Sequence, residues 1–297
     1  MAREAIYGPF GPEGARLREQ LWIIPGAQAE VPLRATVFKP PAVAFASSVS
    51  GPRGQGTLRL PLVVINHGSD DATREAVSMP VFYWLSRWFV ERGYVVLLPQ
   101  RRGHGATGGE FVEGRDTCAD PDHYGAGVAA ADDVEAALRF MAAQPFIDPD
   151  RTIIVGVSTG GWAALALAAR NPPGVRLVVN FAGGRGGHAY GRSNAVCAPD
   201  RLIAAAAQYG TASRVPTYWI YARNDSYFGP ELATKMARAW QQSGGTAELR
   251  VLGPYGSEGH NVVGDRGGWA LWGSELEEFI ARHDGMAHGE RRFSGMH

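Results

Sequence analysis

The sequence has little lysine, little cysteine, no net charge and no long apolar run, and each shortage excludes a class of protein. Lysine occurs only at Lys39 and Lys235, and the 29 basic residues are balanced by 29 acidic ones. A chain without net charge lacks the broad field that attracts nucleic acids or anionic membranes. We therefore expect neither of these partners, and a small neutral or mixed-charge molecule suits the composition better.

The compartment is only weakly indicated by the sequence. No run approaches the roughly 20 apolar residues that cross a bilayer, and residues 1–9 lack the apolar core of a signal peptide. These features predict a cytoplasmic protein by default. Cys118 and Cys197 leave the question open, because a disulfide between them would indicate the periplasm or secretion.

Strand and helix signals alternate along the chain without a break. A hairpin is expected at 21–24 and 34–38, followed by an exposed connection at 40–56. Apolar strands are then expected at 62–66, 94–98, 152–155, 175–179, 215–221 and 247–252, with helices near 81–90, 126–143 and 161–167. This rhythm predicts an α/β fold with right-handed crossovers: a doubly wound, mostly parallel sheet with an N-terminal antiparallel hairpin. We expect one domain over residues 1–297, with its core at about 18–283 and a polar tail at 284–297.

The sequence Gly156-Val157-Ser158-Thr159-Gly160 lies between a β-branched run and an Ala-rich helix former. This is the strand, sharp turn and helix of a G-x-S-x-G nucleophile elbow, which holds a serine hydroxyl above a sheet. The pentapeptide alone is weak support, since glycine-rich turns between strands and helices are common. Its context decides the interpretation.

That context is an acid and a histidine later in the chain. Asp225 directly follows the strand at 215–221, and His260 lies in a Gly-rich loop after the strand at 247–252. The order Ser158, Asp225, His260 is that of α/β-hydrolases. All three follow strands, so the fold would bring them to the carboxyl edge of the sheet. His260 would be the base and Asp225 its partner, while Asp200, Glu258 and Asp265 remain possible substitutes for Asp225.

With these residues the chain resembles the α/β-hydrolase superfamily over about residues 18–283, and most closely its dienelactone-hydrolase-like and prolyl-oligopeptidase-like serine esterases. The resemblance implies an oxyanion hole made by the backbone N–H groups of Thr159 and Ser69, the latter in a family-like Asn-His-Gly-Ser loop at 66–69. It also implies no metal and no organic cofactor. Tyr227 and Phe228, next to Asp225, would line the pocket.

Two insertions would cover the site, since the chain has no room for a large cap domain. They lie at 108–124 and between the strands ending near Asn180 and starting at Val215. Because Cys118 and Cys197 lie one in each insertion, we expect a disulfide across the cover.

Other candidates have simpler explanations. The loop at 101–105 is expected to tie the chain to the sheet edge, and His67 to brace its own loop rather than to bind metal, for which no ligand partners have zinc-like spacing. Asp132 and Asp133 are adjacent on a helix and are expected to be solvated. The Gly-rich stretch at 103–109 lacks the Gly-Lys-Ser/Thr ending of a phosphate loop.

We therefore predict a serine hydrolase that cleaves carboxylic esters of small substrates through an acyl-enzyme. One alternative is a serine peptidase or amidase of the prolyl-oligopeptidase type, although such enzymes usually carry a gating domain. The other is an inactive hydrolase fold used for binding. The acyl and alcohol groups of the substrate and the oligomeric state are not determined by the sequence.

Overall fold

The structure, a computed structural model, describes residues 7–41, 59–69, 74–79, 82–114 and 117–283. Most of the predicted connection at 40–56 and all of the predicted tail at 284–297 lie outside the described residues. The prediction of one domain over 1–297 therefore stays a prediction.

One twisted sheet of nine strands runs through the described residues in the order β1-β2-β3-β5-β4-β6-β7-β8-β9. The first three strands and β5 pair antiparallel, and the remaining pairs are parallel. The expected mostly parallel sheet with an N-terminal antiparallel hairpin is thus confirmed. The strands are β1 Gly8–Phe10, β2 Gln20–Ile24, β3 Leu33–Phe38, β4 Leu60–Asn66, β5 Val95–Gln100, β6 Ile147–Val157, β7 Val175–Phe181, β8 Thr217–Ala222 and β9 Ala247–Leu252.

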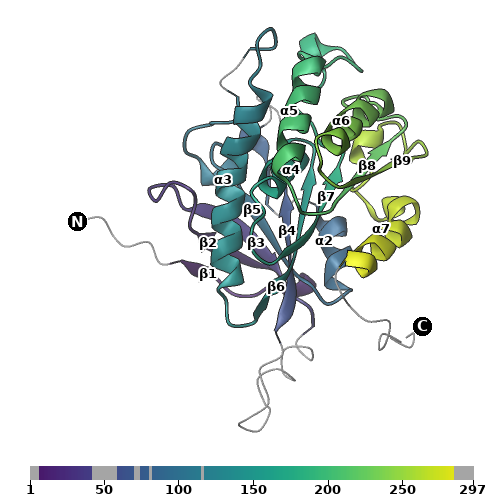
Figure 1. Cartoon of the computed structure of the whole chain (residues 1–297). Coiled ribbons are helices and arrows are strands. Elements are labelled where there is room, and N and C mark those ends of the chain that lie inside the picture. Colours follow the sequence, from purple (N-terminus) through teal and green to yellow (C-terminus); the bar gives the residue numbers. More distant parts are fainter. Residues whose placement is uncertain (1–6, 42–58, 70–73, 80–81, 115–116, 284–297) are drawn as a thin grey trace.

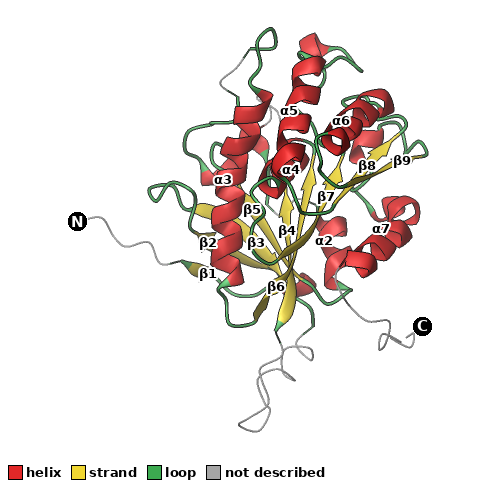
Figure 2. Cartoon of the chain, viewed as in Figure 1, coloured by secondary structure: helices red, strands yellow, loops and turns green. Residues whose placement is uncertain are grey.

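Helices cover both faces of this sheet (Figures 1 and 2). One face carries α3 His123–Ala142, α4 Thr159–Ala168, α5 Pro199–Ala212 and α6 Pro230–Gln242, and the other carries α2 Tyr83–Val90 and α7 Trp269–His283. An apolar core lies on each side of the sheet, between the strands and the helices. These two cores explain why the central strands contain unbroken apolar runs. In β4, Leu62 and Val64 face the first group of helices, whereas Val63 and Ile65 face the second. A strand that is buried on both faces does not alternate between polar and apolar residues.

The elbow helix α4 is the most enclosed element of the first layer. It contacts α3, α5, β6 and β7, and every residue from Gly160 to Ala168 is buried. This enclosure accounts for its composition, because only Gly, Ala, Leu and one Trp follow Thr159. An apolar, small-residue helix of this kind can lie close against the sheet and its neighbours.

The parallel strands place their carboxyl ends at one edge of the sheet. Ser158 follows β6 directly, Asp225 follows β8, and His260 is in the loop after β9. The loop after β4 adds Ser69, and the loop after β7 adds a glycine-rich segment at 183–187. No helix among the described residues is long and apolar enough to cross a membrane.

Candidate active site

The elbow fixes the backbone of Ser158 in an uncommon conformation, with φ 57° and ψ −124°. A non-glycine residue adopts positive φ only where its surroundings hold it there. The turn is held by hydrogen bonds from Ser158 N–H to Phe181 O at 3.0 Å and from Trp162 N–H to Ser158 O at 3.1 Å. A side chain at Gly160 would collide with the carbonyl groups of Asn66 and His67. The glycine of the motif therefore allows the elbow to lie directly against the loop after β4.

Asp225 and His260 form a close pair. The buried Asp225 carboxylate accepts the N–H groups of Tyr227 at 2.8 Å and Phe228 at 2.9 Å, and both of its oxygens lie 3.1 Å from His260 Nδ1. An acceptor facing Nδ1 places the imidazole proton on that nitrogen, which leaves Nε2 free to take a proton. The structure thus brings these two predicted residues together in the orientation that a general base requires.

Glu258, considered above as a substitute for Asp225, instead braces the two loops. Its Oε1 accepts the N–H groups of Ser226 at 3.1 Å and His260 at 2.9 Å, and its Oε2 accepts the Ser226 hydroxyl. Burial alone would raise the pKa of Glu258, but these three donors hold the pKa below its usual value. Glu258 therefore stays ionised and fastens the histidine loop to the aspartate loop.

A stack of three rings forms the wall beside the histidine. The Tyr227 ring lies 4.3 Å from that of His260, and the His188 ring lies 3.6 Å from Tyr227 on its other side. His188 Nε2 is also 2.8 Å from Ser226 Oγ. Sequence reasoning missed His188. Its one available signal is that it belongs to the insertion that follows β7.

Ser158 and His260 line the same cavity, although no hydrogen bond joins their side chains in the part of the chain that the structure describes. The cavity has a volume of about 580 Å³, within the usual range for small-molecule sites. Tyr227 and Phe228 lie in its wall, where the sequence places them. In free enzymes the bond between nucleophile and base is often long and tightens only when substrate binds.

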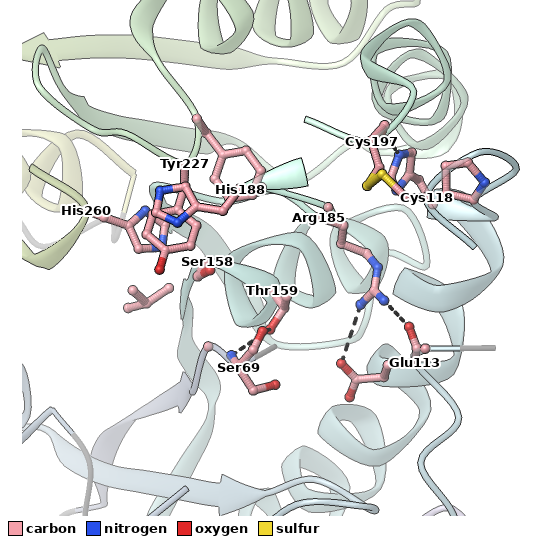
Figure 3. A pocket seen from close by; sticks show the side chains of 18 of the residues that line it. Ser69, Glu113, Cys118, Ser158, Thr159, Arg185, His188, Cys197, Tyr227 and His260 are labelled. Atoms are coloured by element: carbon pink, nitrogen blue, oxygen red, sulfur yellow. Dashed lines mark hydrogen bonds and ion pairs between the residues drawn. A yellow bond between two sulfur atoms is a disulfide. The ribbon is translucent and has the colours of Figure 1, made fainter. Parts of the chain in front are cut away.

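The two expected oxyanion donors lie side by side, but one is engaged. Ser69 N–H donates to Thr159 Oγ1 at 3.0 Å, and the Thr159 hydroxyl lies 3.3 Å from Ser69 O (Figure 3). The Thr159 side chain must therefore turn before Ser69 N–H can reach an oxyanion. The Thr159 N–H lies at the first residue of α4, and among the described residues it donates to no loop or cap carbonyl.

Two buried histidines support the Ser69 loop. His67 Nε2 accepts Arg101 N–H at 3.1 Å, and His104 Nε2 lies 2.6 Å from Ser69 Oγ while its Nδ1 lies 2.9 Å from Arg102 O. Burial, with the nearby Arg101 guanidinium, lowers the pKa of His104 to about 4 and holds that of His67 well below its usual value. Both rings are neutral at pH 7. His67 thus braces the loop, as the sequence indicated.

The loop after β5 is tied down by buried ion pairs. Arg101 makes a two-pronged contact with Glu113 at 2.6 and 3.2 Å, and Arg102 Nε lies 3.2 Å from Asp133 Oδ2. The expectation that Asp133 is solvated is wrong. It is buried and also accepts the N–H groups of Arg102 and Ala27. Helix periodicity could not show this, because the partners of Asp133 come from distant loops. Asp132, by contrast, is partly exposed and pairs with Arg170.

A disulfide joins Cys118 and Cys197, one from each insertion, and both residues line the cavity (Figure 3). The Cα atoms are 4.8 Å apart, although the two residues are separated by 79 positions in sequence. The insertions thus form one cross-linked wall. Across the described ranges, no group of three or more His, Cys, Asp or Glu side chains could hold a metal ion.

Comparison with known proteins extends this description. The profile of the prolyl oligopeptidase family matches residues 80–183, from the start of α2 to the loop after β7. The polyketide transferase af380 of Aspergillus fumigatus is 32% identical over 113 residues, which are 38% of this chain and 34% of that protein. The similar region thus spans about a third of the curated relative.

Solved structures resemble nearly the whole chain. A proposed dienelactone hydrolase from Klebsiella pneumoniae is 15% identical with a TM-score of 0.55, covering 91% of this chain and 98% of its own. The esterase Pf2001 from Pyrococcus furiosus is 16% identical with a TM-score of 0.62, covering 94% and 98%. The chain therefore has the α/β-hydrolase fold, and its resemblance to dienelactone hydrolases and prolyl oligopeptidases is confirmed. Together these matches support a serine hydrolase of esterase or peptidase type.

Proposed function

We propose that this protein is a serine esterase that hydrolyses carboxylic esters of small molecules through an acyl-enzyme on Ser158. The observation that carries the proposal is the His260 ring, which is oriented by Asp225 and lines the same cavity as Ser158. A serine hydroxyl is a poor nucleophile unless a base takes its proton. In this proposal His260 is that base, Asp225 orients it, and the cavity beside Ser158 receives the substrate.

In this mechanism Ser158 Oγ attacks the ester carbonyl carbon while His260 Nε2 takes the hydroxyl proton. The negative charge that develops on the carbonyl oxygen is received by Thr159 N–H and, once the Thr159 side chain has turned, by Ser69 N–H. The tetrahedral intermediate then collapses, and His260 passes its proton to the departing alcohol oxygen. Water repeats the same steps on the acyl-enzyme and releases the acid, while Asp225 stabilises each transient imidazolium.

A peptidase or amidase is the second candidate, because the prolyl oligopeptidase profile matches the elbow segment. Matched p-nitrophenyl esters and p-nitroanilides of the same acyl group separate the two activities. We expect ester turnover with little anilide turnover. Short acyl groups, acetyl to butyryl, should be preferred, since each methylene adds about 0.8 kcal/mol only where a groove buries it. A kcat/KM that still rises beyond eight carbons would contradict this.

An inactive binding protein is tested by a fluorophosphonate probe, which labels only a serine activated by a base. We expect one labelled site, at Ser158, and no labelling of the Ser158→Ala variant. Absence of labelling in the folded wild-type protein would overturn the esterase proposal. The disulfide is compatible with an oxidising, extracytoplasmic compartment.

A further inference from the structure

Arg185 is a charged side chain in the cavity for which the mechanism has no use. It lies in the glycine-rich loop after β7, lines the cavity, and its side chain is 11% exposed. Its Nη2 donates to the backbone oxygen of Glu113, and its Nη1 lies 3.7 Å from Glu113 Oε2. A guanidinium has five N–H donors. Among the described residues, no other hydrogen-bond acceptor contacts the Arg185 guanidinium. Several of its N–H donors therefore remain for a ligand.

The charges around Arg185 do not balance. Glu113 and Arg185 are the only Asp, Glu, Lys or Arg side chains among the described residues that line the cavity. Glu113, however, is already neutralised by its two contacts with buried Arg101. Burial alone would raise the pKa of Glu113, but mainly Arg101, and least of all Arg185, hold the pKa below its usual value, so it stays a carboxylate. His104 beside them is neutral. Within the described group of Arg101, Glu113 and Arg185, two positive charges and one negative charge leave an excess of one positive charge.

The position of Arg185 indicates which part of a substrate it meets. In Figure 3, Ser158 lies between His260 on one side and Arg185 on the other. Because the histidine passes its proton to the leaving alcohol, the alcohol lies on the His260 side. The acyl group of the acyl-enzyme then extends toward Arg185 and the disulfide-linked wall.

We propose that Arg185 is a specificity-determining residue that binds a carboxylate at the far end of the acyl group, so that the preferred substrates are monoesters of short dicarboxylic acids. This inference rests on the proposed esterase function. A guanidinium fork matches a carboxylate in geometry, and a single negative charge balances the excess positive charge. A charge so little exposed to water gains more from such a partner than one on the surface does.

The test compares two esters of equal acyl length, p-nitrophenyl hemiglutarate and p-nitrophenyl valerate, which differ in a terminal carboxylate or methyl group. Spontaneous hydrolysis is measured for each ester and subtracted. We expect the wild-type kcat/KM for the hemiglutarate to exceed that for the valerate by roughly 10-fold or more. Arg185→Gln should lower this ratio about 10- to 100-fold, and Arg185→Lys should retain part of it.

Arg201→Gln is the matched control. Arg201 belongs to the same cover and pairs with Asp120, but it is exposed and does not line the cavity. This variant should keep the wild-type ratio. A wild-type ratio near one, or the same fall in Arg185→Gln and Arg201→Gln, would overturn the inference.

If Arg185→Gln does not fold, competition on the wild-type enzyme decides. Glutarate should inhibit hemiglutarate hydrolysis more strongly than inorganic phosphate does, and the reverse order would reject the carboxylate assignment.

A binding measurement separates this inference from the proposed function. Calorimetric titration of the Ser158→Ala protein with glutarate needs no catalysis. Adding Arg185→Gln to this protein should raise the Kd for glutarate, by a factor similar to the fall in the hemiglutarate-to-valerate ratio of kcat/KM. Glutarate binding that depends on Arg185 supports the anion site even if no ester is hydrolysed. Ester hydrolysis without glutarate binding overturns the anion site and leaves the esterase proposal standing.

Discussion

The two sides of Ser158 are held together in different ways. On the His260 side, short loops after β8 and β9 are joined by hydrogen bonds among Asp225, Ser226, Glu258 and His260. On the Arg185 side, two longer insertions are joined by a disulfide and by the buried charges of Arg101, Glu113 and Arg185. Both sides follow the carboxyl ends of strands. Among the described residues, only the second is fastened by a disulfide and by buried ion pairs.

This difference separates reaction from recognition. Groups that move protons need positions fixed to a fraction of an ångström, and loops leaving a rigid sheet provide this. Groups that recognise a substrate can be carried by insertions, provided that these are fastened to each other. We therefore expect changes on the His260 side to act on kcat and changes on the Arg185 side to act on substrate choice and stability.

The largest expected effect lies at the boundary of the two sides. Ser158→Ala removes only the hydroxyl oxygen, and ester hydrolysis should fall by roughly 10³-fold or more while the fold is kept. Initial rates with p-nitrophenyl butyrate and a circular dichroism spectrum measure the two properties. A pure, folded variant with wild-type activity would show that another residue is the nucleophile.

Removing the cross-link tests the Arg185 side by itself. The double variant Cys118→Ser/Cys197→Ser frees a loop whose ends are 79 positions apart. The free energy of unfolding should fall by about 2–4 kcal/mol, because the unfolded chain gains conformational entropy. Urea denaturation of the oxidised wild type and the variant measures this. The same treatment of reduced wild type should reproduce the loss, and equal stability of all three proteins would contradict a structural role for the bond.

Acid should weaken the region that supports the Ser69 loop. The pKa of His104 is lowered from 6.5 to about 4 in the folded state, mainly by burial. The unfolded chain therefore binds more protons between these pH values. The stabilisation is complete above pH 6.5 and is lost as the pH falls toward 4, by about 3 kcal/mol for this group. Urea midpoints from pH 7 to 4 should fall less steeply for His104→Gln. Parallel slopes would count against this assignment.

The smallest expected effect concerns the oxyanion hole. Thr159→Val keeps the shape of the side chain but removes the oxygen that occupies Ser69 N–H. If the N–H must be freed for each turnover, kcat should rise by up to about fivefold, the equivalent of one hydrogen bond of about 1 kcal/mol. Steady-state kinetics with a short neutral ester measure the change. A marked loss of kcat would mean that the Thr159 hydroxyl takes part in the reaction.

Much of the fold could be predicted because strand and helix periods are local. The run at 62–66 is apolar on both faces, and the structure buries it between two layers of helices. The candidate triad could be proposed because each member follows a strand. Asp133 and Glu113 could not be interpreted in the same way, since their partners are Arg102 and Arg101 in a loop about 30 and 12 positions away. Such pairings depend on how loops pass over the sheet edge, which no local pattern encodes.

The cross-link also makes the wall beside Arg185 sensitive to redox conditions. Reduction would free the two insertions from each other, whereas the hydrogen bonds that hold His260 contain no sulfur and would be kept. We therefore expect a reductant to change the ratio of anionic to neutral ester turnover more than it changes the rate with a neutral ester.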